Sequence, residues 1–476
     1  MSGNSMAANR MTLVDAAVAI ARREITAVDV LQSCLDAIAL HDGDTNAVVA
    51  IERDEAMQAA EAADRAVAAG SKLGPLHGIP LAHKDMYYRA GKTSACGSAI
   101  RADFVPERTA TVMDRLHQAG SITFARLNMA EFAQNPTGHN RHHGDCHNPW
   151  NLPYITGGSS SGSGAAVAAR YTFGALGSDT GGSIRLPASA CGVTGLKPTQ
   201  TRVSRAGVMP LSFSADNVGP LTRTARDCAR LMTVIAGHDP ADPTSSAEPV
   251  PDYEAALTGD LAGTTIGLVA NHDLAGSSPV VTAAVAEAVR ALAARGATVI
   301  DITLPLMDAV SAYGSIVSRC EGATIHARWM REQPQDYAVH LSARLYAGYA
   351  IPATHYIEAL SARGKLLRAF CEAVFASVDI IAMPTIPSAL PTLEATDIDH
   401  GPPGTEHAFM AISANTRPFN YLGLPALSLP CGFDEAGLPA GLQLVGRPFA
   451  EAHLLRAGDA LQRDTDWHTR LPPLLS

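Results

Sequence analysis

Segments with helical and strand patterns alternate along the whole chain of 476 residues. Residues 10–41 carry two amphipathic helical patterns, whereas residues 264–270, 279–295 and 297–303 read as strand, helix and strand. Such a unit implies parallel pairing, because the crossover helix returns the chain in the same direction. The sequence therefore predicts a single large α/β domain with a mixed, mostly parallel central sheet that helices cover on both faces.

The composition is that of a globular protein and argues against several function classes. Hydrophobic residues make up 47% and aromatic residues 5%, so small and branched aliphatic side chains must fill the interior. The formal net charge is −10 without a basic patch, which argues against nucleic acids and anionic membranes as partners. No apolar run approaches the roughly 20 residues of a transmembrane helix, and the N-terminus lacks a signal-peptide pattern. Eight scattered cysteines without a CxxC pair favour reduced thiols and a cytoplasmic protein.

Two clusters of glycine and serine lie between residues 157 and 185. Their flanks are apolar, which does not suit a flexible linker. A phosphate-binding loop needs GxxxxGK[ST], and no lysine follows the glycines here. Gly158 to Gly162 formally fits the GxSxG nucleophile elbow, but the strand that should precede it is missing. These two clusters are therefore candidates for parts of a different catalytic site.

The second cluster, residues 179–185, combines bare backbone amides with a serine. Successive glycines leave N–H groups beside Ser183, and each such donor can stabilise an oxyanion by roughly 3–4 kcal/mol. The serine also needs a base. Lys84 ends the apolar stretch GIPLAHK, where burial would lower its pKa, although an exposed lysine at a strand end is the simpler alternative. The 17 histidines leave a Ser-His-Asp arrangement open.

Several motifs together resemble the amidase signature family. They are GIPLAHKD (78–85), NMAEF (128–132), GGSSSGSG (157–164), DTGGSIR (179–185), NYLGLPALSLPCG (420–432) and GLQLVGRPFAE (441–451). The resemblance implies the family's fold and a Ser–Ser–Lys triad. In that triad Ser183 matches the nucleophile, Ser159 matches the bridging serine that follows a cis peptide bond, and Lys84 matches the base.

Further site residues follow from the same motifs. The backbone amides expected to hold the oxyanion belong to Thr180, Gly181, Gly182 and Ser183. The residues expected to support the site without taking part in the chemistry are Ser160, Asp179 and Arg185. Ala133 and Gln134 are candidates for lining the substrate pocket.

Histidines and a cysteine gather in one loop and raise the question of a metal site. They are His139, His142, His143, Cys146 and His147. Their spacing is loosely compatible with metal ligation. The family that the chain resembles uses no metal in this loop, so we expect neither a metal nor any other cofactor.

We expect residues 1–476 to form one amidase domain with four recognisable regions. These are N-terminal helices at about 10–70, a signature core at about 75–235, a variable substrate-side region at about 305–355 and C-terminal core strands at about 375–450. The variable region could form a lid over the substrate or simply pack as helices.

The resemblance implies a hydrolase that acts on carbon–nitrogen bonds other than peptide bonds. We expect a stand-alone amidase for uncharged aryl or hydrophobic acyl amides, with ester and carbamate (urethane) hydrolysis through the same acyl-enzyme. Two alternatives stay open: an A-subunit-like glutamine amidotransferase working in a complex, and an inactive scaffold. Ser161 and Ala130 depart from the family pattern and weaken assignment to the A-subunit. The expected partner is a small amide, without nucleic acid or membrane, and a homodimer is left open.

Overall fold

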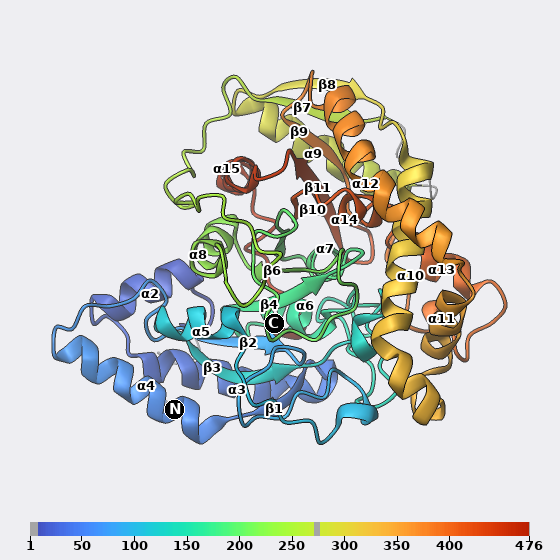
Figure 1. Cartoon of the computed structure of the whole chain (residues 1–476). Helices are drawn as coiled ribbons and strands as arrows, with labels where there is room; N and C mark the ends of the chain where they lie inside the picture. Colours follow the sequence, from blue (N-terminus) through green and yellow to red (C-terminus); the bar gives the residue numbers. More distant parts are fainter. Residues whose placement is uncertain (1–7, 271–276, 476) are drawn as a thin grey trace.

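One sheet of eleven strands runs through the computed structural model, which describes residues 8–270 and 277–475 (Figure 1). The strands are β1 (Val48–Ile51), β2 (Pro80–Lys84), β3 (Ile122–Leu127), β4 (Gly174–Asp179), β5 (Thr194–Lys197), β6 (Asn217–Thr222), β7 (Thr265–Val269), β8 (Thr298–Ile302), β9 (Ile380–Pro384), β10 (Ala426–Phe433) and β11 (Pro439–Gly446). Their order is β1-β3-β2-β4-β6-β5-β10-β11-β9-β7-β8. The predicted α/β class with a mixed central sheet is confirmed.

The direction of the strands differs from the prediction in one respect. Parallel pairing joins β2 to β3, β2 to β4, β7 to β8 and β7 to β9. The other six neighbouring pairs of this sheet are antiparallel. The sheet is therefore not mostly parallel. Its centre is built from β4, β6, β5, β10, β11 and β9, which alternate in direction and need no crossover helix between hydrogen-bonded neighbours.

Helices cover both faces of the sheet. Every residue of β2, β4, β6, β9 and β11 is buried, which requires cover on both sides. The helices are α2 (Leu13–Ala21), α3 (Ala27–Thr45), α4 (Arg53–Ala68), α5 (Thr111–Gln118), α6 (Ser161–Ala168), α7 (Arg185–Ala190), α8 (Ala225–Ile235), α9 (Pro279–Ala294), α10 (Met307–Glu332), α11 (Val339–Tyr349), α12 (Ala353–Val374), α13 (Thr405–Ala411), α14 (Arg417–Tyr421) and α15 (Glu451–Asp464). The long helices α10 and α12 stand side by side along one flank (Figure 1).

The first two helices that the structure describes, α2 and α3, begin at threonine caps. The Thr12 hydroxyl accepts from the Asp15 amide at the start of α2. Thr26 and Asp29 form a reciprocal capping box at the start of α3. Each cap satisfies amides that the first helical turn leaves without an intrahelical partner, which fixes the start of the helix.

Two adjacent parallel strands position the candidate site. Ala82 of β2 pairs with Ala175 of β4, so the carboxyl ends of these strands lie at the same edge of the sheet. Lys84 is the last residue of β2, and Asp179 is the last residue of β4. Both glycine-serine clusters meet this edge, because one cluster leads into α6 and the other joins β4 to α7.

Candidate active site

Lys84 lies at the centre of the site and is almost completely buried, with 1% of its surface exposed. Its Nζ donates to the Ser159 Oγ at 2.7 Å and to the Ser178 Oγ at 2.9 Å. Burial lowers the pKa of Lys84 from 10.5 to about 7, although the charges of Asp179 and Asp216 act in the opposite direction. A large fraction of this amine is therefore neutral near pH 7 and able to accept a proton.

The first glycine-serine cluster brings Ser159 to the lysine. The Gly158–Ser159 peptide bond is cis, as the resemblance implies, and Ser159 is fully buried. Gly157 has a φ of 68°, and a Cβ atom on it would lie 2.7 Å from the backbone of Leu186. A side chain at Gly157 would therefore collide with the start of α7. The cluster joins the two halves of the site by close backbone packing.

The second cluster places Ser183 in the wall of a cavity. Ser183 is 9% exposed and lines this cavity together with Thr180 and Gly181. Among the described residues, no acceptor is bound to the amides of Thr180, Gly181 and Ser183. The Gly182 amide, in contrast, donates to the Asp179 Oδ1 at 2.7 Å. The Gly182 N–H is therefore engaged within the loop in this structure, and its role as an oxyanion donor stays a prediction.

Asp179 and Arg185 form a buried pair behind this loop. The Arg185 Nε and Nη2 donate to the two carboxylate oxygens of Asp179, each at 2.9 Å. Although burial raises the pKa of Asp179, the charge and hydrogen bonds of Arg185 lower it to about 2. Asn420 and Gln443 bind the same pair from the C-terminal part of the chain. The pair thus ties the loop to α14 and β11.

Ser160 and Ser178 are hydrogen-bonded to each other beside Lys84 and Ser159. The Ser178 amide donates to the Ser160 Oγ at 3.3 Å, and the Ser160 hydroxyl contacts the Ser178 carbonyl at 3.4 Å. The sequence motifs pointed to Ser160 but not to Ser178, the second acceptor of the Lys84 amine. A signal was present, since Ser178 immediately precedes Asp179 at the end of a strand that leads into the predicted site.

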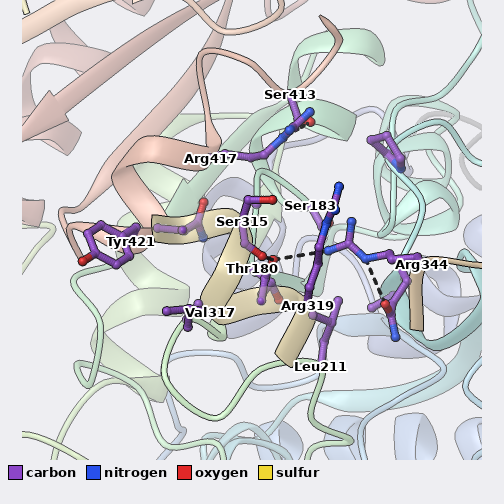
Figure 2. A pocket seen from close by; sticks show the side chains of 18 of the residues that line it. Thr180, Ser183, Leu211, Ser315, Val317, Arg319, Arg344, Ser413, Arg417 and Tyr421 are labelled. Carbon is purple, nitrogen blue, oxygen red and sulfur yellow. Dashed lines mark hydrogen bonds between the residues drawn. The ribbon is translucent and has the colours of Figure 1, made fainter. Parts of the chain in front are cut away.

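The cavity beside Ser183 has a volume of about 100 Å³ (Figure 2). Ala133 and Gln134 are among the residues that line it, and their role in binding substrate stays a prediction. Region 305–355 contributes to it through α10 and α11. Four of the lining residues are arginines, namely Arg319, Arg344, Arg363 and Arg417. Among the described lining residues none carries a carboxylate, so the cavity is strongly cationic.

The histidine-rich loop has other contacts. The His139 Nδ1 lies 2.9 Å from an oxygen of Asp145, and the His142 Nε2 lies 2.9 Å from an oxygen of Glu131. In the part of the chain that the structure describes, no three histidine, cysteine, aspartate or glutamate side chains are grouped closely enough to hold a metal ion. These histidines therefore take part in the hydrogen bonds of the loop.

A family model named Amidase matches residues 29–455. The chain belongs to the amidase family. A curated relative, the A-subunit of the glutamyl-tRNA(Gln) amidotransferase of Roseiflexus sp. (strain RS-1), is 41% identical over 98% of this chain and 99% of its own. The A-subunit of the same enzyme from Thermotoga maritima has a solved structure with a TM-score of 0.81 and 29% identity, covering 98% of this chain and 97% of that chain.

Another solved structure is also similar over most of its length. It is described as "An unexpected vestigial protein complex reveals the evolutionary origins of an s-triazine catabolic enzyme". Its TM-score is 0.89 at 34% identity, with 95% of this chain and 98% of that chain covered. Family membership and the family fold are therefore shown.

The expected substrate class has to be corrected. We expected a stand-alone hydrolase of uncharged aryl or hydrophobic amides with esterase and urethanase activity. Curated relatives at about 40% identity over nearly the whole chain carry the name of an amidotransferase subunit instead. The four arginines give a physical reason, because an uncharged hydrophobic acyl group gains nothing from a cationic cavity and leaves the guanidinium groups without a counterion.

The expected partners have to be corrected as well. We expected a small amide alone, with no nucleic acid. The names of the relatives include glutamyl-tRNA and describe one subunit of a larger enzyme. The prediction rested on the overall negative charge of one chain, and in a multi-subunit enzyme such a charge says nothing about the surfaces of the other subunits. Within residues 8–270 and 277–475, every helix is too short or too polar to span a bilayer.

Proposed function

We propose that this chain is the amide-hydrolysing A-subunit of a glutamine-dependent, tRNA-linked amidotransferase. The observation that carries the proposal is its identity of about 40% to A-subunit relatives across nearly the full length of both proteins. The site supports it, because a Ser–Ser–Lys arrangement can break an amide bond and the cationic cavity suits the α-carboxylate of glutamine. A cytoplasmic setting is part of the proposal and is compatible with eight free cysteines.

Neutral Lys84 starts the chemistry as the general base. It accepts the Ser159 proton while Ser159 takes the proton of Ser183, and the Ser183 Oγ attacks the side-chain amide carbonyl of glutamine. The unengaged amides of Thr180, Gly181 and Ser183 hold the developing oxyanion. Each of these donors is worth roughly 3–4 kcal/mol in the transition state.

The acyl-enzyme then forms and breaks down in two steps. The proton held by Lys84 returns to the leaving nitrogen, and the carbon–nitrogen bond breaks to release ammonia. Water repeats the cycle on the Ser183 ester and releases glutamate. In the proposed complex a phosphoryl donor such as ATP activates the side-chain carboxylate of glutamyl-tRNA, and the ammonia displaces the phosphate to form the amide, a step that takes place outside this chain's own site.

The test compares the chain alone with the chain purified together with its co-purifying subunits. We expect ammonia release from glutamine by the complex and, with ATP as phosphoryl donor, conversion of glutamyl-tRNA to glutaminyl-tRNA. Ser183→Ala should lower ammonia release by a factor on the order of 10⁶, to background, whereas Ser71→Ala at an exposed position should not change it. A chain that binds no other subunit and leaves glutamine intact would contradict the proposal.

A further inference from the structure

Three arginines beside the nucleophile lack a protein counterion. Arg319, Arg344 and Arg417 line the cavity that also contains Ser183, and they come from α10, α11 and α14 (Figure 2). None of the three forms an ion pair with a carboxylate in the described ranges. Like charges gathered in one cavity repel each other, so an anion bound among them would be strongly stabilised.

The hydrogen bonds of these arginines go to neutral groups. The Arg344 Nε donates to the Gln134 Oε1 at 3.2 Å, and its Nη2 donates to the Ser318 Oγ at 3.3 Å. The Arg417 Nε donates to the Ser413 Oγ at 2.7 Å. Neutral acceptors orient a guanidinium without cancelling its charge, so both groups keep their affinity for an anion.

Two further donors in the same wall have no acceptor. The Arg319 Nε and the Gln134 Nε2 are buried, and neither has a hydrogen-bond partner among the described residues. Buried donors without an acceptor cost free energy, which a ligand carboxylate would recover. Burial first, and then the charges of Arg319 and Arg417, lower the pKa of Arg344 to about 10, which still leaves it charged near pH 7.

Three further charged groups near this cavity have hydrogen-bond partners within the protein, and one of them is Asp216, whose carboxylate accepts from the Thr180 hydroxyl and from the Leu211 and Ser212 amides. Arg363 donates to the carbonyl oxygens of Tyr421 and Ser214 at 2.5 and 2.6 Å. Glu321 of α10 accepts from the Ser214 amide, the Ser214 hydroxyl and the Tyr356 hydroxyl. This carboxylate is therefore occupied and does not line the cavity, so it offers no place for a ligand ammonium group.

We infer that the site recognises its amide substrate through a carboxylate bound by Arg319, Arg344 and Arg417, and that it makes no use of an α-ammonium group. The preferred substrate class is the monoamide of a dicarboxylic acid, of which glutamine is the member carrying an additional ammonium group. This inference rests on the proposed amide-hydrolysing function of the same site. It adds to that function a substrate specificity: the acyl group must carry a carboxylate.

Three amides of equal chain length test the rule in the preparation that contains the co-purifying subunits. Glutaramate is glutamine without the ammonium group, and pentanamide also lacks the carboxylate. We expect kcat/KM for ammonia release from glutaramate to equal or exceed that for glutamine. We expect the value for pentanamide to be lower by about 100-fold, since it loses charge-assisted hydrogen bonds to the arginines.

The possible results separate this inference from the proposed function. Turnover of glutamine with at least ten-fold slower turnover of glutaramate would overturn the inference and leave the proposed function intact. Turnover of glutaramate without turnover of glutamine would support the inference and contradict the proposed function. Pentanamide turned over as fast as glutaramate would also overturn the inference.

If none of the three amides is turned over, a binding measurement tests whether the arginines recognise a carboxylate. Glutarate is titrated calorimetrically into Ser183→Ala protein with and without Arg344→Met, and Arg417→Met serves as a second variant if the first fails to fold. We expect either variant to weaken binding by about ten-fold or more. Arg328→Met, exposed on the same helix as Arg319, is the matched control and should leave binding unchanged. Absence of glutarate binding, or equal binding by all variants, would overturn the inference.

Discussion

The fraction of neutral Lys84 should set the reactivity of Ser183. With a pKa of about 7 in the folded protein, the amine is neutral in roughly one molecule in ten at pH 6, half at pH 7 and nine in ten at pH 8. If the neutral amine acts as the base, as proposed, the rate of attack by Ser183 rises about ten-fold from pH 6 to its plateau. The logarithm of the rate should have a slope of one below pH 7.

A fluorophosphonate probe measures this rate without a known substrate or partner. It reacts with an activated serine, so initial rates of labelling from pH 5 to pH 11 report the ionisation of the base directly. Lys84→Ala should lower the rate by about 10²- to 10⁴-fold, the usual contribution of a general base. It should also remove the inflection near pH 7. Circular dichroism at each pH shows whether the fold is retained.

Three results would refute this reasoning. A flat profile would mean that no base titrates in this range. A midpoint near 10.5 would mean that the Lys84 amine remains solvated in solution. An inflection near pH 7 that persists in Lys84→Ala would assign the base to another residue, and a histidine would then be the first candidate.

Three further predictions concern stability and the support of the site. Folding lowers the pKa of Lys84 from 10.5 to about 7, so the free energy of unfolding of the protein falls as the pH is lowered from 10.5 to 7. In urea unfolding, Lys84→Met should be more stable than the wild type by up to about 5 kcal/mol at pH 7. This difference in stability should disappear by pH 10.5. Ser178→Ala removes one acceptor of the Lys84 amine and should slow probe labelling about ten-fold; an unchanged rate would exclude a positioning role. Asp179→Asn leaves Arg185 buried without its counterion and should cost about 3–5 kcal/mol in urea unfolding; a loss below about 1 kcal/mol would contradict this account.

Local sequence patterns predicted the elements whose signals are local. The strand–helix–strand unit of β7, α9 and β8 pairs in parallel as expected. Thr12 and Thr26 cap their helices because a short polar side chain before an apolar run is sufficient to fix a helix start. Lys84 is buried at a strand end, so the simpler alternative of an exposed lysine at that position is wrong.

Features that depend on distant segments were beyond the reach of local patterns. The central strands are buried on both faces, so they lack the alternation of polar and apolar residues that would mark them as antiparallel. Arg344 and Arg417 stand in helices far apart in the sequence and meet only after the chain has folded. Local sequence patterns therefore do not reveal that the cavity is cationic. The wrong prediction of an uncharged substrate follows from this.

The buried Asp179–Arg185 pair also sets the order in which the site can be completed during synthesis. Asp179 is bound by Asn420, 241 residues later, and Arg185 is bound by Gln443, 258 residues later. A ribosome adding about 5–20 residues per second needs roughly 10 to 50 s to make that intervening chain. Throughout this interval the nascent chain carries its serine and lysine without the contacts that fix the nucleophile loop. The nucleophile loop can therefore be fixed only after the last part of the polypeptide has been made. A chain truncated before residue 420 lacks both the Asn420 and the Gln443 contact.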